Sequence, residues 1–95
     1  MIVNWTENSI EHLVGIYDYI SQRSPTYARR TVDRLTRRSE QLADFPMSGR
    51  MVPEYNMRNI REVIEGSYRI IYHLRPQQID VIAVMHSAQE LPEID

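Results

Sequence analysis

The side chains best suited to chemistry lie in the second half of the chain. Arginines and histidines alternate there with glutamates: Arg50, Arg58, Arg61, Arg69, His73, Arg75 and His86, with Glu54, Glu62 and Glu65. Phosphodiester transfer needs a base for the nucleophile, an acid for the leaving oxygen and cations for the developing charge. Glu, Arg, His and Tyr could supply these roles. The spacing is not specific, however, and a small sheet with charged outward positions is the commoner explanation.

A second group of arginines lies between residues 24 and 44. Four of them fall together, opposite the apolar positions, when the segment is read at helical spacing: Arg30, Arg34, Arg37 and Arg38. This pattern is typical of a solvated helix face with a few weak ion pairs. It also fits a contact surface for an acidic partner protein or for phosphate, which planar guanidinium groups bind through two hydrogen bonds.

The composition excludes several chemistries. All 11 basic residues are arginine, and the chain has no cysteine. It therefore has no lysine Schiff base, no P-loop lysine, no thiol nucleophile and no thiolate metal ligand. His12, His73 and His86 are too scattered to indicate a zinc site, and the 3 glycines form no phosphate-binding loop. We expect no metal and no cofactor.

The length of 95 residues allows a single domain over 1–95. The apolar fraction of 42% and the charged fraction of 25% are ordinary for a globular protein. A net charge of −2 and a pI of 5.9 argue against broad, non-specific nucleic-acid binding. No apolar run approaches a membrane span, and Met1–Ser9 lacks the apolar region of a secretory signal. We expect a soluble, cytoplasmic protein with no membrane partner.

The first half of the sequence predicts a strand followed by two helices. Residues 2–5 form a β-branched and aromatic run, and Thr6 then serves as an N-cap. Apolar residues follow at spacings of three and four, which predicts one helix ending near residues 21–23: Ile10, Leu13, Val14, Tyr17 and Ile20. Ser24 and Pro25 start a second helix that runs to about Asp44. The short connection predicts an antiparallel helical hairpin.

The second half predicts a loop over 45–59 and then three strands, Ile60–Glu65, Tyr68–Leu74 and Ile79–His86, joined by short turns. Simple alternation puts Ile79, Val81, Ala83 and Met85 on one face of the last strand, and Ile82, Val84 and His86 on the other. Both faces are largely apolar, so this strand should be central and covered. The tail, residues 87–95, carries only acidic charges.

The predicted element order is therefore β-α-α-β-β-β. It defines an α+β fold in which a helical hairpin packs on a small, mainly antiparallel sheet. On the middle strand of the final three, Tyr68, Ile70 and Tyr72 should share one face, while Arg69, Ile71 and His73 share the other.

Several segments of the chain form a distinctive series. They include the opening strand with Trp5-Thr6 and the pattern of the first helix. The later segments read FPMSGRMVPEY, IREVIEGSYRIIYHL and IDVIAVMHSAQELP. This series resembles the RelE/ParE superfamily of toxin–antitoxin toxins, and within it the ParE branch. No single piece is decisive, but together they cover nearly the whole chain in the right order. The β-α-α-β-β-β order, reached independently from periodicity, matches the family's fold.

The resemblance implies a toxin that a cognate antitoxin, ParD-like or similar, neutralises in a hetero-oligomeric complex. ParE-type members bind DNA gyrase and trap it on cleaved DNA without chemistry of their own, whereas RelE-type members cleave mRNA on the ribosome. RelE-like ribonucleases are typically strongly basic and use lysines, which this chain lacks. Gyrase is therefore the expected target and the ribosome the alternative.

The resemblance also implies residue roles. A ribonuclease of another branch would use a set imitated here by Glu54 or Glu62, Arg61 or Arg69, and His86, although Ser87 stands where one such branch has an aromatic residue. The antitoxin would dock on the apolar rim of the hairpin and on the sheet edge, through Leu13, Tyr17, Ile20, Arg34, Arg38, Arg61, Arg69 and Tyr72. Arg50, Arg58 and His86 are the candidates for target binding.

Overall fold

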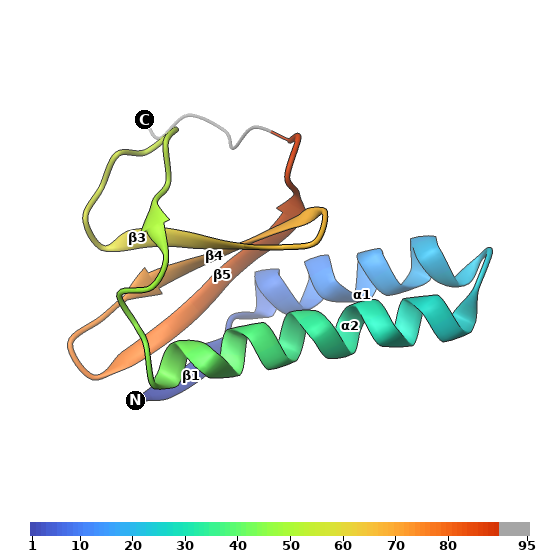
Figure 1. Ribbon diagram of the computed structural model, residues 1–95, viewed down its shortest axis with the longest axis horizontal. Helices are drawn as coiled ribbons and strands as arrows, with labels where there is room; N and C mark the ends of the chain where they lie inside the picture. Colours follow the sequence, from blue (N-terminus) through green and yellow to red (C-terminus); the bar gives the residue numbers. More distant parts are fainter. Residues whose placement is uncertain (90–95) are drawn as a thin grey trace.

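The computed structural model describes residues 1–89, so the acidic positions predicted for the tail beyond Gln89 lie outside the described residues. The helices are α1 (Glu7–Ser21) and α2 (Pro25–Glu40), followed by the short 3-10 helix η1 (Gln41–Ala43). The strands are β1 (Ile2–Trp5), β2 (Arg50–Met51), β3 (Ile60–Glu65), β4 (Tyr68–Leu74) and β5 (Gln78–His86). The helical hairpin covers one face of the sheet and extends past its end, as Figure 1 shows.

The sheet has the strand order β1-β5-β4-β3-β2, and it confirms the predicted α+β architecture. The pairs β2–β3, β3–β4 and β4–β5 are antiparallel, while β1 pairs in parallel with β5. Two details differ from the prediction. The segment 45–59 contains the two-residue strand β2 in what was expected to be loop alone, and α2 ends at Glu40 because the chain tightens into η1.

Both helices begin where the capping residues predict. The hydroxyl of Thr6 accepts a hydrogen bond from the backbone N–H of Ser9 at 3.2 Å, and Ser24 does the same for Tyr27 at 3.1 Å. These side chains satisfy backbone donors that have no partner within the helix. Thr6 also donates to the carbonyl of Val81 at 3.0 Å, so the cap of α1 is tied to β5.

The apolar core lies on both faces of the sheet. Between helices and sheet it is built from Leu35, Leu42, Val63, Ile70, Tyr72, Ile79, Val81 and Val84. On the far face, Val52 packs against Ile71 and Ala83. Val52 belongs to residues 45–59, between η1 and β3, which we call the covering segment. Strand β5 is therefore internal and covered, as predicted, although β4 is the middle strand of the five.

The predicted faces of β5 are wrong beyond Val81, because the strand contains a β-bulge. Tyr72 pairs with Val81 and Ile71 pairs with Ala83, so Ile82 is an extra residue. A bulge of this kind reverses the alternation that follows it. Ile79 and Val81 face the helices, whereas Ala83 packs on the far face and Val84 returns to the helix side. Asn8 of α1 donates to the carbonyl of Ile82 at 3.1 Å and so satisfies the irregular backbone.

Candidate functional site

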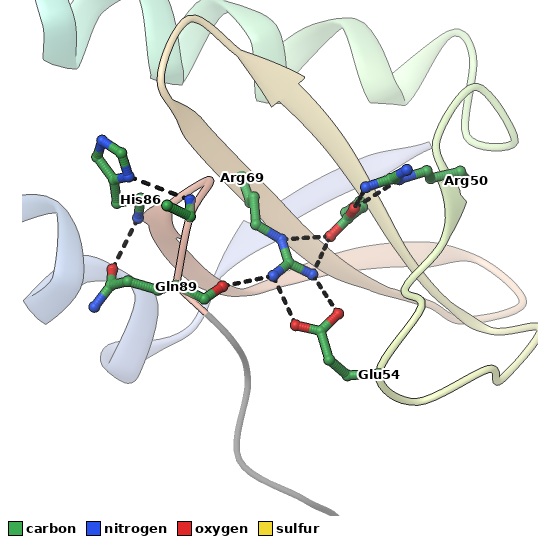
Figure 2. A network of polar contacts seen from close by, with 7 residues as sticks. Arg50, Glu54, Arg69, His86 and Gln89 are labelled. Atoms are coloured by element: carbon green, nitrogen blue, oxygen red, sulfur yellow. Dashed lines mark hydrogen bonds and ion pairs between the residues drawn. The ribbon is translucent and has the colours of Figure 1, made fainter.

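A network of charged side chains occupies the far face of the sheet, centred on Arg69 of β4 (Figure 2). Arg69 is 5% exposed. Its Nη1 and Nη2 groups donate to the two carboxylate oxygens of Glu54 at 2.7 and 2.8 Å. Its Nε donates to Glu62 at 2.7 Å, Nη2 also contacts Glu62 at 2.6 Å, and Nη1 reaches the carbonyl of Gln89 at 2.8 Å. Every N–H of this guanidinium group therefore has a partner within the chain.

Arg50 completes the network at the sheet edge. The strand register places Arg50 of β2 directly opposite Glu62 of β3, and its Nε and Nη2 both lie 2.7 Å from the second carboxylate oxygen of Glu62. Glu62 is 1% exposed, so its charge is held away from water. Within the network, the positive charges of Arg50 and Arg69 balance the negative charges of Glu54 and Glu62. The hydrogen bonds that Arg69 donates to Glu54, followed by those to Glu62, outweigh burial and raise the pKa of Arg69 above its usual value.

Arg61 lies elsewhere, on the helix side of the sheet. It pairs in register with Tyr72, whose ring belongs to the core under the helices. Its guanidinium donates to the backbone carbonyls of Gly49 at 2.9 Å and Arg58 at 3.1 Å. Tyr72 accepts from the N–H of Gly49 at 3.0 Å and donates to the carbonyl of Pro46 at 2.8 Å. These contacts fasten the segment after α2 to the sheet, and burial raises the pKa of the Tyr72 hydroxyl.

His86 also lies apart from the network. Figure 2 shows its imidazole turned away from Arg69 and Glu54. The ring meets Tyr68 edge to face at 5.9 Å, and it lines a groove of about 600 Å³ together with His12 and Tyr19 of α1. Its Nδ1 accepts a hydrogen bond from the N–H of Ala88 at 3.2 Å. The bulge in β5 explains this position, because it puts His86 on the same side as Val84.

Of the four residues that a ribonuclease reading would combine, the structure brings together only Glu54 and Arg69. Arg61 is engaged with backbone carbonyls on the helix side, and His86 faces the groove beside α1. Glu62, the alternative carboxylate, is buried between Arg50 and Arg69. The arrangement holds the covering segment and the residues after β5 against the sheet. It does not assemble an acid, a base and a free cation at one point.

The residues expected to contact an antitoxin divide by exposure. Tyr72 is fully buried and Arg69 nearly so. Leu13, Tyr17, Ile20, Arg38 and Arg61 are half-buried, and Arg34 is exposed. The exposed apolar side chains of the hairpin were only partly expected: Ile10 at 47%, Val14 at 53%, Tyr19 at 76% and Tyr27 at 53%. Among the candidates for target binding, Arg58 is exposed and Arg50 is tied to Glu62.

Two polar contacts were not foreseen from the sequence. Asp80 of β5 accepts from Asn4 of β1 at 3.3 Å, from Gln78 at 2.6 Å and from Arg75. His12 of α1 accepts from the backbone N–H of Val84 at 3.2 Å, on the edge of β5 that β1 leaves open. The only sequence signal for Asp80 was a charge inside an apolar strand, which a buried position requires to be paired.

Within residues 1–89, no group of three or more potential ligands is placed to hold a metal ion. Over the same residues, no helix combines the length and the apolar character needed to cross a bilayer.

Solved structures share this fold. The chain matches the chromosomal ParDE toxin–antitoxin system of P. aeruginosa with a TM-score of 0.74 at 18% identity, covering 90% of this chain and 95% of the other. It also matches the toxin–antitoxin complex RelBE2 of Mycobacterium tuberculosis with a TM-score of 0.59 at 16% identity, with the same coverage of 90% and 95%. The helical hairpin on a five-stranded mixed sheet is thus a fold that this chain shares with a chain of each of these two systems.

Comparison of the sequence with known proteins identifies the family. Residues 3–91 match the family described as the ParE toxin of the type II toxin–antitoxin system parDE. Toxin RelE2 of Caulobacter vibrioides is 32% identical over 88 residues, which cover 92% of this chain and 96% of that protein. The chain therefore belongs to the ParE toxin family of type II toxin–antitoxin systems, within the RelE/ParE superfamily.

Proposed function

We propose that this toxin acts by binding DNA gyrase and trapping it on cleaved DNA, without catalysing a reaction of its own. The observation that carries the proposal is the state of Arg69. All of its donors are engaged by Glu54, Glu62 and the carbonyl of Gln89, so the buried guanidinium has none left for a scissile phosphate. A ribonuclease would need such a cation beside its acid and base.

The positions of the remaining candidates support the same proposal. His86 and Arg61 lie apart from the Arg69 network, and general acid–base catalysis requires its groups within hydrogen-bond reach of one substrate. A binding toxin needs no such convergence. It needs exposed contact residues, and Arg58 and His86 remain the candidates for target contact, with Arg50 contributing its exposed part.

We also propose that a ParD-like antitoxin neutralises the toxin in a hetero-oligomeric complex. The solved neighbours are toxin–antitoxin assemblies. The docking surface that we propose is the apolar rim of the hairpin, where Ile10 and Val14 stay exposed beside the half-buried Leu13, Tyr17 and Ile20. Arg34 and Arg38 of α2 and Arg61 of β3 are the charged candidates for antitoxin contact. An amphipathic antitoxin segment that folds on binding would cover such a rim.

A gyrase assay with the purified full chain tests the target. We expect inhibition of supercoiling and accumulation of cleaved DNA at micromolar toxin. In the same preparation, translating transcripts should remain intact. Full supercoiling activity, together with cleavage of mRNA on ribosomes, would instead establish the ribonuclease function.

The variants H86A and R61A separate the two mechanisms further. A catalyst should lose most of its activity, about 100-fold or more, when one acid–base or cationic group is removed. A binding protein should show smaller losses that are spread over several contacts. We expect each single variant to retain gyrase inhibition within about tenfold, and T26A serves as a control, because Thr26 is exposed and belongs to neither the target-binding nor the antitoxin-binding set.

A further inference from the structure

The charge of the hairpin is strongly divided between its helices. Within its bounds, α2 carries five arginines against Asp33 and Glu40, whereas α1 carries three acidic residues and no arginine. Three of the α2 arginines, Arg30, Arg34 and Arg37, follow one another at spacings of four and three, so they lie on one face of the helix. All three are exposed. We call this set the arginine ridge.

The arginine ridge has no acidic partner within residues 1–89. The ion pairs of that part of the chain involve Arg50, Arg69 and Arg75, and no α2 arginine takes part in one. Like charges at these spacings oppose helix formation. The helix therefore tolerates a repulsion that an external anion would relieve.

We propose that the arginine ridge binds the phosphate backbone of duplex DNA. The ridge carries three guanidinium groups over about 10 Å from Arg30 to Arg37 at 1.5 Å per residue, which allows about one phosphate contact for each arginine. A shallow hollow of about 420 Å³ runs beside it, lined by Tyr27, Arg30, Asp33, Arg34 and Arg37. Guanidinium groups bind phosphate oxygens through paired hydrogen bonds. A row of arginines therefore suits a row of phosphates better than a single negative charge.

Arg34 also belongs to the surface proposed for the antitoxin, but an acidic protein segment fits the ridge as a whole less well than DNA does. Protein interfaces depend on buried apolar or aromatic anchors, and charged residues are depleted at their centres. Tyr27 is the one aromatic side chain that lines the hollow, and the other lining residues are charged. The net charge of −2 does not oppose DNA binding at the ridge, because charges more than about 10 Å away are screened at moderate salt.

This inference rests on the proposed function, since a toxin that holds gyrase on cleaved DNA works beside duplex DNA. The ridge would add a DNA contact to the protein contact. It would strengthen the ternary complex while contributing little to toxin binding by gyrase alone.

The test measures binding of the full chain to a fluorescent 25-base-pair duplex without gyrase, by anisotropy, between 50 and 200 mM salt. For about three phosphate contacts, affinity should fall about 40-fold over that range. The double variant R30Q/R34Q should bind about tenfold more weakly at the lower salt, with the slope of log affinity against log salt reduced by about two. The variant R30K/R34K, which keeps the charge, should retain most of the slope.

The matched control is R23Q/R29Q, which changes the net charge equally at exposed arginines off the ridge. We expect its affinity to stay within about twofold of the wild type. Equal losses for the two double variants, or no DNA binding by the wild type, would overturn the proposal. The proposal would also be overturned if R30Q/R34Q weakened the antitoxin complex and left DNA binding unchanged, because the ridge would then be a protein-binding surface. Binding of each variant to gyrase is also measured without DNA. If the wild type does not bind gyrase, the proposed target is wrong, and this result is distinct from a failure of the ridge to bind DNA.

Discussion

At the scale of single residues, the most informative side chain is Arg69. From the sequence it was one of several arginines that could stabilise a phosphate, and also a candidate contact for the antitoxin. In the structure it is buried, and its hydrogen bonds join β4 to Glu54 of the covering segment, to Glu62 of β3 and to the backbone at Gln89. Its role in the free chain is therefore to hold three parts of the chain together.

This role predicts a large cost for removing the charge. The variant R69Q leaves Glu62 buried with only Arg50 as a cationic partner, and breaking a buried pair from one side costs about 3–5 kcal/mol. Urea unfolding should show this loss in the free energy of unfolding. The control is R29Q, because Arg29 is exposed on α2 and takes part in no ion pair within residues 1–89, so its loss should change the free energy of unfolding by about 0.5 kcal/mol or less. Similar small losses for both variants would show that the buried network contributes little to stability.

At the scale of elements, the caps and the bulge decide which side chains meet. Thr6 begins α1 directly after β1, and its hydroxyl also donates to Val81, the residue that precedes the bulge at Ile82. The bulge then turns Val84 and His86 towards α1, where His12 contacts the N–H of Val84. One irregular residue therefore places His86 in the groove beside α1 and away from Arg69.

The two helix caps provide a matched comparison. The variant S24A removes one cap hydrogen bond from the start of α2, and it should cost about 1 kcal/mol of unfolding free energy. The variant T6A removes a cap hydrogen bond and also the bond from the Thr6 hydroxyl to Val81, although the backbone N–H of Thr6 still donates to that carbonyl. It should therefore cost about 2 kcal/mol. Thermal or urea unfolding of the two variants measures the difference. Equal costs would mean that the bond from the Thr6 hydroxyl to Val81 adds nothing to the stability of the fold.

At the scale of the whole molecule, the N-terminal strand β1 forms one edge of the sheet and pairs in parallel with β5, whereas the other strands pair antiparallel. Asp80 lies at this junction, where Asn4 of β1 donates to it together with Gln78 and Arg75. Burial raises the pKa of Asp80, but these hydrogen bonds outweigh it and hold the pKa below its usual value. The carboxylate therefore stabilises the fold while it is ionised.

This shift predicts the acid dependence of stability. A carboxyl group whose pKa is lower in the folded state adds stability above its unfolded pKa of about 3.9, and this stability is lost as the pH falls through the folded pKa. At pH 7 the variant D80N should be less stable than the wild type by about 1–3 kcal/mol. The difference should shrink as the pH falls below about 4. Urea unfolding at pH 7 and pH 3 checks this, and a difference that stays constant would contradict the role assigned to the ionised carboxylate.

The sequence by itself determined the elements and the class of fold. Local signals suffice for that purpose: Thr6 and Ser24 cap the helices, apolar spacing sets the hairpin, and alternation sets β3 and β4, whose bounds were predicted correctly. The composition also excluded lysine and cysteine chemistry without any structure. These conclusions depend on residues close together in the chain.

Only the tertiary structure decided how the charged residues are grouped. Glu54, Glu62 and Arg69 are separated in sequence by loops and turns, and their common network exists because β2, β3 and β4 pair in a particular register. The side of the sheet that His86 faces depended on the bulge at Ile82, which is not visible as an interruption of the apolar pattern. Periodicity reports which residues are buried within one strand, but contacts between strands follow from register, and register is fixed by the packing of the whole chain.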